Sequence, residues 1–424
     1  MTGTTVRVMA GSAALALGVT ACGGGTQGDE GPSVEEGGTL TFANYQWGEP
    51  ERGEAIWEAV SGYTEENPQV ELEQQEISRQ EYENTLNTQM GGGEGPDLLI
   101  IPDTYLMELA GGQLLEPLDD VLDAEDEERL TEYNEFANVE GEQLALSWDT
   151  APYALFWNSN ILDEAGVEPP TTPEELVEAA VEIEENTDAA GFAARHQMNE
   201  EVPWWVDFGN WPLGFGGGWS DGQELTIDSS ENIEALTAFK EVYDSGGLTV
   251  GDDASTFRSR FAEGEVGMGI DNSAALYSTV GGDGELDSED VEASALPFPG
   301  DASVRLGVNV GVNVHSENKT LAKDFLRWMF AEEGQERLSH AVAPSSVGTA
   351  DTPIPEEVVE EHPWVPDFED QLPESHPEVI EGFEVETPRI RSFILPEVER
   401  VLTDDADPAE ALEQAQDQAT SEVE

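Results

Sequence analysis

The sequence predicts an α/β fold, and the order of its apolar segments is the main reason. Short apolar or alternating runs predict strands at 39–43, 70–72 and 98–101. Apolar residues at helical spacing predict helices over 51–66 and 105–110. An alternation of strands and helices favours a parallel sheet covered by helices. The length of 424 residues favours two lobes.

Capping patterns support the helices further along the chain. Thr172 is the predicted N-cap of one helix, with Pro173 at its first position and Glu175 completing a capping box. Asp407 begins a similar pattern before the last helix. The remaining predicted elements are strands at 153–157, 225–227, 266–270 and 308–314, and helices at 233–243 and 319–330.

The charge excludes several functions. Lys and Arg total 16 against 92 Asp and Glu, which gives a net charge of −76. Such a chain repels nucleic acid and anionic membrane surfaces, so neither is expected as a partner. Self-repulsion also opposes folding in dilute buffer, whereas molar salt screens it. Together with ten Trp and clear periodicity, this composition predicts a folded protein adapted to a salty medium.

The N-terminus predicts export and a lipid anchor. Residues 1–21 hold a short apolar run typical of a signal peptide. Val19-Thr20-Ala21-Cys22 resembles the bacterial lipobox, in which the cysteine becomes the lipidated N-terminus. Cys22 is the only cysteine, so no internal disulfide forms. Residues 22–38 are rich in Gly and predict a flexible tether, so the expected location is extracytoplasmic, anchored to the outer face of the membrane.

Several separated segments carry a resemblance to a family. They are 95–101 with 114–118, 152–158 with 162–176, 261–268, and 296–299 with 311–328. In this order they resemble the bacterial extracellular solute-binding proteins of ABC importers (family 1, maltose-binding type). The resemblance covers most of residues 38–415.

The resemblance implies a two-lobed, periplasmic-binding-protein-like fold of type II, with a ligand cleft between lobes joined by crossover hinge segments. One lobe would comprise residues 38–147 plus 306–350, and the other 148–305 plus 351–424. Ligand would shift the protein towards a closed form by hinge motion. The permease subunits of the ABC importer would recognise that form. The family implies a monomer without enzymatic activity or cofactor.

Residues 204–219 hold the densest aromatic cluster of the chain. Neutral sugars present C–H faces that aromatic rings cover and hydroxyls that carboxylates and amides bind. The position of the cluster resembles the aromatic sugar platform of the family. We therefore predict ligand contacts from Trp204, Trp205 and Trp211.

Further ligand contacts are predicted where strands end, because open α/β sheets bind ligands there. Those in the first lobe and at the first crossover are Trp47, Glu49, Asp103, Thr104, Trp148 and Asp149. Those after the strand at 266–270 and at the second crossover are Asp271, Asn272 and Asn309. Ser273 follows Asn272 where the family often has an aromatic residue, and Arg391 is a further candidate.

Other chemistries find little support in the sequence. Gly218-Trp-Ser220-Asp-Gly222 matches a nucleophile elbow, but it follows a Gly-rich aromatic loop instead of a buried strand. No Lys follows a Gly in a phosphate-binding loop, and the five His lack metal-ligand spacing, so no metal is predicted. A sugar, most naturally a di- or oligosaccharide, is the first choice of ligand. A polyamine or quaternary ammonium osmolyte is the alternative, and a surface glycosidase is the third hypothesis.

Overall fold

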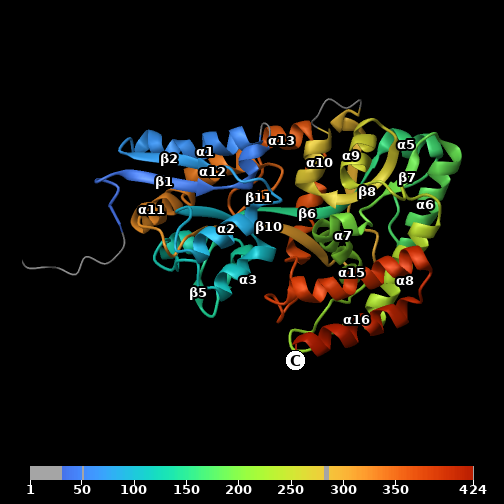
Figure 1. The fold of residues 1–424 in the computed structure, drawn as a ribbon. Coiled ribbons are helices and arrows are strands. Elements are labelled where there is room, and N and C mark those ends of the chain that lie inside the picture. The colour runs from blue at the N-terminus through green and yellow to red at the C-terminus, as the bar shows by residue number, and fades with distance from the viewer. Residues whose placement is uncertain (1–30, 50–51, 281–285, 424) are drawn as a thin grey trace, which may run out of the picture.

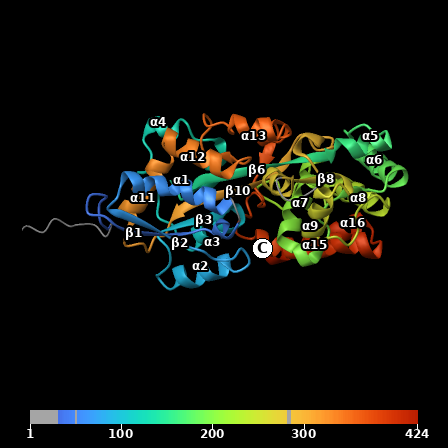
Figure 2. The ribbon, with the colours of Figure 1, turned by 90° about the horizontal axis from the view of Figure 1, so that it is seen from above.

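The computed structural model describes residues 31–49, 52–280 and 286–423. The predicted signal peptide, Cys22 and the first part of the tether lie outside these residues. The described chain forms two lobes side by side, connected by long strands (Figures 1 and 2). No helix in the described part of the chain has the length and apolar character needed to cross a membrane.

The first lobe is built on a sheet covered by helices on both faces. Strands β1, β2 and β3 are parallel, and β10 runs antiparallel to β3. Two separate apolar clusters flank the sheet, one including Phe42 and Phe325 and the other including Tyr82 and Leu106. Its strands are β1 (Gly38–Ala43), β2 (Val70–Gln75), β3 (Leu98–Pro102), β4 (Asn138–Val139), β5 (Glu142–Gln143) and β11 (Ser346–Val347). Its helices are η1 (Tyr45–Gly48), α1 (Arg52–Glu66), α2 (Tyr82–Gly91), α3 (Asp103–Gly111), α4 (Ala124–Glu127), η2 (Glu132–Ala137), α11 (Lys319–Met329) and α12 (Glu332–Val342).

The second lobe has the same layered plan. Strand β8 runs parallel to β7 and antiparallel to the long strand β6, and apolar clusters lie on both faces. Its strands are β7 (Ala190–Ala193), β8 (Val266–Asn272), β9 (Val291–Ser294) and β12 (Ser375–His376). Its helices are α5 (Ser159–Ala165), α6 (Pro173–Asn186), η3 (Met198–Glu200), α7 (Glu201–Gly214), α8 (Ser230–Asp244), α9 (Ala254–Ala262), α10 (Ser273–Val280), η4 (Ser288–Asp290), α13 (Glu356–Glu361), α14 (Val365–Glu369), η5 (Leu372–Glu374), α15 (Thr387–Asp404) and α16 (Pro408–Val423).

Two strands belong to both lobes. Strand β6 (Leu146–Asn158) places Trp148 in the first lobe's core and Tyr153 in the second lobe's core. Strand β10 (Ser303–Val312) likewise places Val304 in the second lobe's core and Val308 in the first lobe's core. The register between β6 and β10 shifts next to Val308, so the ladder is locally irregular where the chain leaves one core for the other. Irregular pairing of this kind bends strands and suits a hinge.

Most predicted elements are confirmed, and the differences have local causes. Thr172 caps α6 by accepting from the backbone N–H of Glu175, while the Glu175 carboxylate accepts from Thr171 instead of closing the box on Thr172. Residues 225–227 form only an isolated bridge to Ser220 and no strand. The aromatic segment was predicted as a loop but is mainly helix α7, because Pro203 lies in its first turn and Pro212 near its end, where a missing N–H matters less.

Candidate functional site

Helix α7 presents two different faces. Trp204, Phe208 and Trp211 recur at helical spacing and point into the core of the second lobe, where their exposed fractions are 0, 2 and 2%. The ring of Trp211 packs against Phe239 and Phe298, with centroids 5.0 and 4.7 Å apart. These side chains are part of the core of the second lobe.

The opposite face of α7 lines a cavity of ≈ 630 Å³. Trp205, Gly209 and Leu213 contribute to this wall from successive turns of the helix. The Trp205 ring stacks on Trp219 with centroids 5.4 Å apart and an interplanar angle of 24°. Trp205 is 3% exposed and also belongs to the core of the second lobe, and the partly buried Trp219 ring covers it at this side of the cavity.

Polar groups complete the wall. Strand β12 contributes His376, the segment after it contributes Glu378, Glu381 and Glu384, and the first lobe contributes Phe136 from η2. The Ser220 hydroxyl donates to the backbone carbonyl of Glu381 (2.5 Å). The serine of the nucleophile-elbow motif therefore connects two segments of the wall and is not hydrogen-bonded to a general base. The cavity therefore combines an aromatic surface with carboxyl groups, as a pocket for a polyhydroxylated or cationic ligand does.

Glu378 has unusual surroundings in this wall. Its exposed fraction is 6%, and its Oε2 has no hydrogen-bond partner. Its backbone carbonyl accepts from Nε1 of Trp205 (3.0 Å). Burial, together with the nearby charge of Asp103, raises the pKa of the carboxyl to about 8, although the charge of Arg79 and hydrogen bonds from Thr104 oppose the rise. At neutral pH this carboxyl is therefore mainly neutral.

Asp103 and Asn309 meet on the first lobe's side of the junction. Asp103 begins α3, directly after β3, and accepts from Nδ2 of Asn309 (2.7 Å). Arg305, Gly307 and Asn309 alternate along β10, so they share one face of the strand. A Cβ on Gly307 would lie 2.2 Å from an Asp103 oxygen, so glycine leaves the room that this carboxylate occupies. Burial raises the pKa of Asp103, and the charge of Arg305 opposes the rise.

Asp149 forms a second polar group in the first lobe. It accepts from Nε2 of Gln46 (3.2 Å) and lies 3.4 Å from Nη2 of Arg52, which also approaches Glu49 at 3.7 Å. Glu49 is exposed beside this group, whereas Trp47 and Trp148, which were also expected to contact ligand, are buried. Trp47 and Trp148 both pack edge-on against Phe42 in the core of the first lobe.

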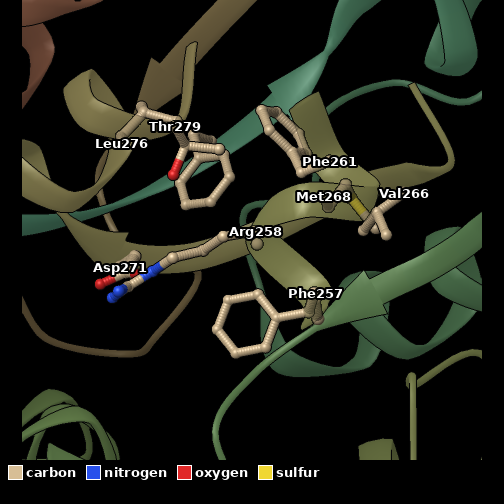
Figure 3. A pocket seen from close by; sticks show the side chains of 11 residues that line it. Phe257, Arg258, Phe261, Val266, Met268, Asp271, Leu276 and Thr279 are labelled. Carbon is tan, nitrogen blue, oxygen red and sulfur yellow. The ribbon is translucent and has the colours of Figure 1, made fainter. Parts of the chain in front are cut away.

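Asp271 and Asn272 lie at the end of β8 and are held by their neighbours. Arg258 pairs with Asp271 at 2.7 Å, and Figure 3 shows the guanidinium reaching the carboxylate between the rings of a small pocket. That pocket has a volume of only ≈ 10 Å³, room for about one water molecule. Asn272 accepts from the backbone N–H of Ala275 and so caps α10. Both side chains have a structural explanation.

The predicted site residues thus fall into groups. Trp205 lines the large cavity, and Asp103 and Thr104 approach its wall at Glu378. The other predicted ligand contacts stay predictions. Of these residues, four lie in polar clusters, namely Asp149, Asp271, Asn272 and Asn309, and four lie in the apolar cores, namely Trp47, Trp148, Trp204 and Trp211. Arg391 pairs with Glu201 at 3.0 Å. Sequence reasoning missed Glu378 and His376, because one acid among 92 and a His-Pro dipeptide carry no distinguishing signal.

A model of one protein family matches residues 47–336, and its description is "Bacterial extracellular solute-binding protein". The chain belongs to this family. The family is extracellular, which agrees with the predicted location outside the cytoplasm.

Three solved structures show how far the fold is shared. The GacH receptor of Streptomyces glaucescens, studied with acarbose, is 22% identical, covers 91% of this chain and 98% of its own, and has a TM-score of 0.79. The maltose-bound MalE3 of T. maritima is 20% identical, covers 90 and 99%, and scores 0.78. UgpB of Mycobacterium tuberculosis, in complex with glycerophosphocholine, is 17% identical, covers 91 and 98%, and scores 0.76. At these identities the likeness shows the two-lobed fold.

Proposed function

We propose that this family member is the substrate-binding lipoprotein of an ABC importer and that it captures a sugar, most naturally a di- or oligosaccharide. The observation that carries the proposal is the ≈ 630 Å³ cavity whose wall includes the stacked pair Trp205 and Trp219. Pockets of roughly 300–1,000 Å³ hold small organic ligands. The indole faces suit the C–H faces of a pyranose, and Glu381, Glu384 and His376 suit its hydroxyls.

The mechanism follows from the crossover strands. We place the lobe boundaries at 38–147 plus 306–350 and at 148–305 plus 351–424. Residues 148–153 of β6 and 306–308 of β10 act as hinges, and ligand contacts from both lobes favour the closed arrangement. The membrane permease recognises that arrangement, and Cys22 keeps the monomeric protein at the outer face of the membrane. The protein catalyses no reaction in this scheme.

Two of the structural neighbours support a sugar. The GacH receptor was crystallised with acarbose and the T. maritima protein with maltose. The third supports the alternative, because glycerophosphocholine carries a quaternary ammonium group. An aromatic pair beside several carboxyl groups also suits a cation, so a polyamine or quaternary ammonium osmolyte is the second candidate.

A thermal-shift screen of residues 31–424 in molar salt tests the proposal. The panel holds maltose, trehalose, longer glucans, spermidine and glycine betaine. A ligand at 100 times its dissociation constant stabilises by about 2.7 kcal/mol, which moves the melting temperature by degrees. A shift with a saccharide supports the sugar proposal, and a shift with cations alone supports the alternative. Release of shorter products from the glucans would instead identify a glycosidase.

We also propose that the protein is adapted to high salt. With a net charge of −76, self-repulsion is strong in dilute buffer, and molar salt shortens the Debye length to about 3 Å. Cooperative unfolding should therefore be seen in molar salt and lost in tens of millimolar salt. Circular dichroism melts across that range test this, and a constant melting temperature would contradict it.

A further inference from the structure

Glu378 and Asp103 lie close together but come from different lobes. Asp103 begins α3 of the first lobe, and Glu378 follows β12 in the second. Both are buried, at 3 and 6% exposed. The charge of Asp103 acts on the Glu378 carboxyl across the junction, and Thr104 of the first lobe donates hydrogen bonds to that carboxyl.

Among the described residues, no Lys or Arg forms an ion pair with Glu378, although the charge of Arg79 lowers the pKa of this carboxyl. Arg79, on the first lobe, forms an ion pair with Glu83 and covers the Tyr45 ring at 5.0 Å. Arg305 of β10 donates to the Ser375 carbonyl (2.6 Å) and covers the ring of Tyr133. From α7 the neighbour is the neutral Trp205.

The segment that carries Glu378 adds no cationic partner for it either. Burial lowers the pKa of His376, so this imidazole stays neutral at neutral pH. Glu381 and Glu384, further along the segment, are acidic. Since Oε2 of Glu378 is buried without a partner, an ionised carboxylate there would be strongly disfavoured, and protonation relieves this.

We propose that Glu378 is a proton-dependent latch between the lobes: it is neutral when the lobes close over the cavity and ionises when they part, so that ligand capture takes up a proton. This inference rests on the proposed function as a binding protein. When the lobes part, the carboxyl regains water and the distance to Asp103 grows, so both effects that favour the neutral acid disappear.

The direction of the pH dependence follows from linkage. The pKa is about 8 in the closed form and near its ordinary value of 4.5 when the carboxyl is hydrated. Between these values the closed form binds one more proton than the open form. Ligand affinity should therefore weaken by up to about tenfold per pH unit as pH rises through this window, and should level off above about pH 8.

The test compares wild type with Glu378→Gln, a neutral isostere, and with Glu374→Gln, an exposed acid on the same segment outside the cavity. Calorimetry with maltose, or with the panel compound that gives the largest thermal shift, is run in molar salt from pH 5.5 to 9. Two buffers of different protonation enthalpy give the number of protons taken up. Wild type and Glu374→Gln should show the slope and an uptake approaching one proton near pH 6.5. Glu378→Gln should show neither, and equal slopes in all three proteins would overturn the latch.

An infrared difference between wild type and Glu378→Gln reports the protonation of this carboxyl directly. At pH 6.5 the band of a protonated carboxyl should be weak in the ligand-free protein and should grow when the ligand is added, and at pH 9.5 it should be weak in both samples. If no panel compound binds, the proposed function fails. If a saccharide binds and the band at pH 6.5 does not grow on binding, the latch fails and the function stands.

Discussion

Trp204 and Trp205 are neighbours in α7 and both belong to the core of the second lobe, at 0 and 3% exposed, yet of the two only Trp205 also lines the cavity. Trp204 shares the buried face with Phe208 and Trp211, and its Nε1 has no partner. Trp205 lines the cavity, stacks on Trp219 and donates to the Glu378 carbonyl. The residue type is the same, so the difference comes from the phase of the helix. We therefore expect substitutions of Trp204, Phe208 and Trp211 to affect stability, and substitution of Trp205 to affect ligand binding as well as stability.

Trp211→Ala should have the largest effect, and on stability. The ring is 2% exposed and packs between Phe239 and Phe298. Removal of a buried tryptophan costs about 3–5 kcal/mol through lost contacts and a residual cavity. Denaturant unfolding in molar salt measures the loss. A change below about 1 kcal/mol would mean that this face is not a packed core.

Trp205→Ala should instead weaken ligand binding by about 1–3 kcal/mol, as the loss of an aromatic anchor does. Calorimetry with the compound found in the thermal-shift screen measures this. Trp328→Ala is the control for losing an indole outside the cavity, on α11 of the first lobe, and denaturant unfolding of both variants separates the loss of stability from the loss of binding. Equal affinities for wild type and Trp205→Ala, with both folded, would remove Trp205 from the site.

Glycine substitutions extend the comparison to the backbone. A Cβ on Gly214 would lie 2.4 Å from the Phe298 ring, so Gly214→Ala should destabilise by about 1–3 kcal/mol through overpacking. A Cβ on Gly209, on the cavity face, would meet only Val304 at 3.0 Å, and alanine favours the helix by about 1 kcal/mol. Thermal melts of both variants should show the larger loss for Gly214→Ala, and the reverse order would contradict the assignment of the faces.

The fold could be predicted to a large extent because its signals are local. Apolar runs such as 98–101 and the cap at Thr172 are set by neighbouring residues, and the structure has a strand and a helix there. The family resemblance supplied the pairing of the lobes. The phase of α7 could not be predicted, since both of its faces are apolar and its prolines and glycines conceal the helical period. Glu378 could not be predicted either, because its environment depends on the nearby charge of Asp103, 275 positions earlier in the chain.

The smallest expected effects come from exchanging each indole for a smaller ring. Trp205→Phe keeps an aromatic face towards Trp219 but loses the hydrogen bond from Nε1 to the backbone carbonyl of Glu378. Because that carbonyl then lacks this donor, the substitution should weaken ligand binding by about 0.5–1.5 kcal/mol. Trp204→Phe removes an N–H that has no partner, so it loses no hydrogen bond and should leave affinity unchanged. Because Trp205 positions the segment that carries Glu378, its variant should also flatten the pH dependence of binding. Calorimetry of both variants at pH 6.5 and 8.5 measures the two effects together. Equal affinity losses in the two variants would mean that the indole N–H of Trp205 has no part in positioning the cavity wall.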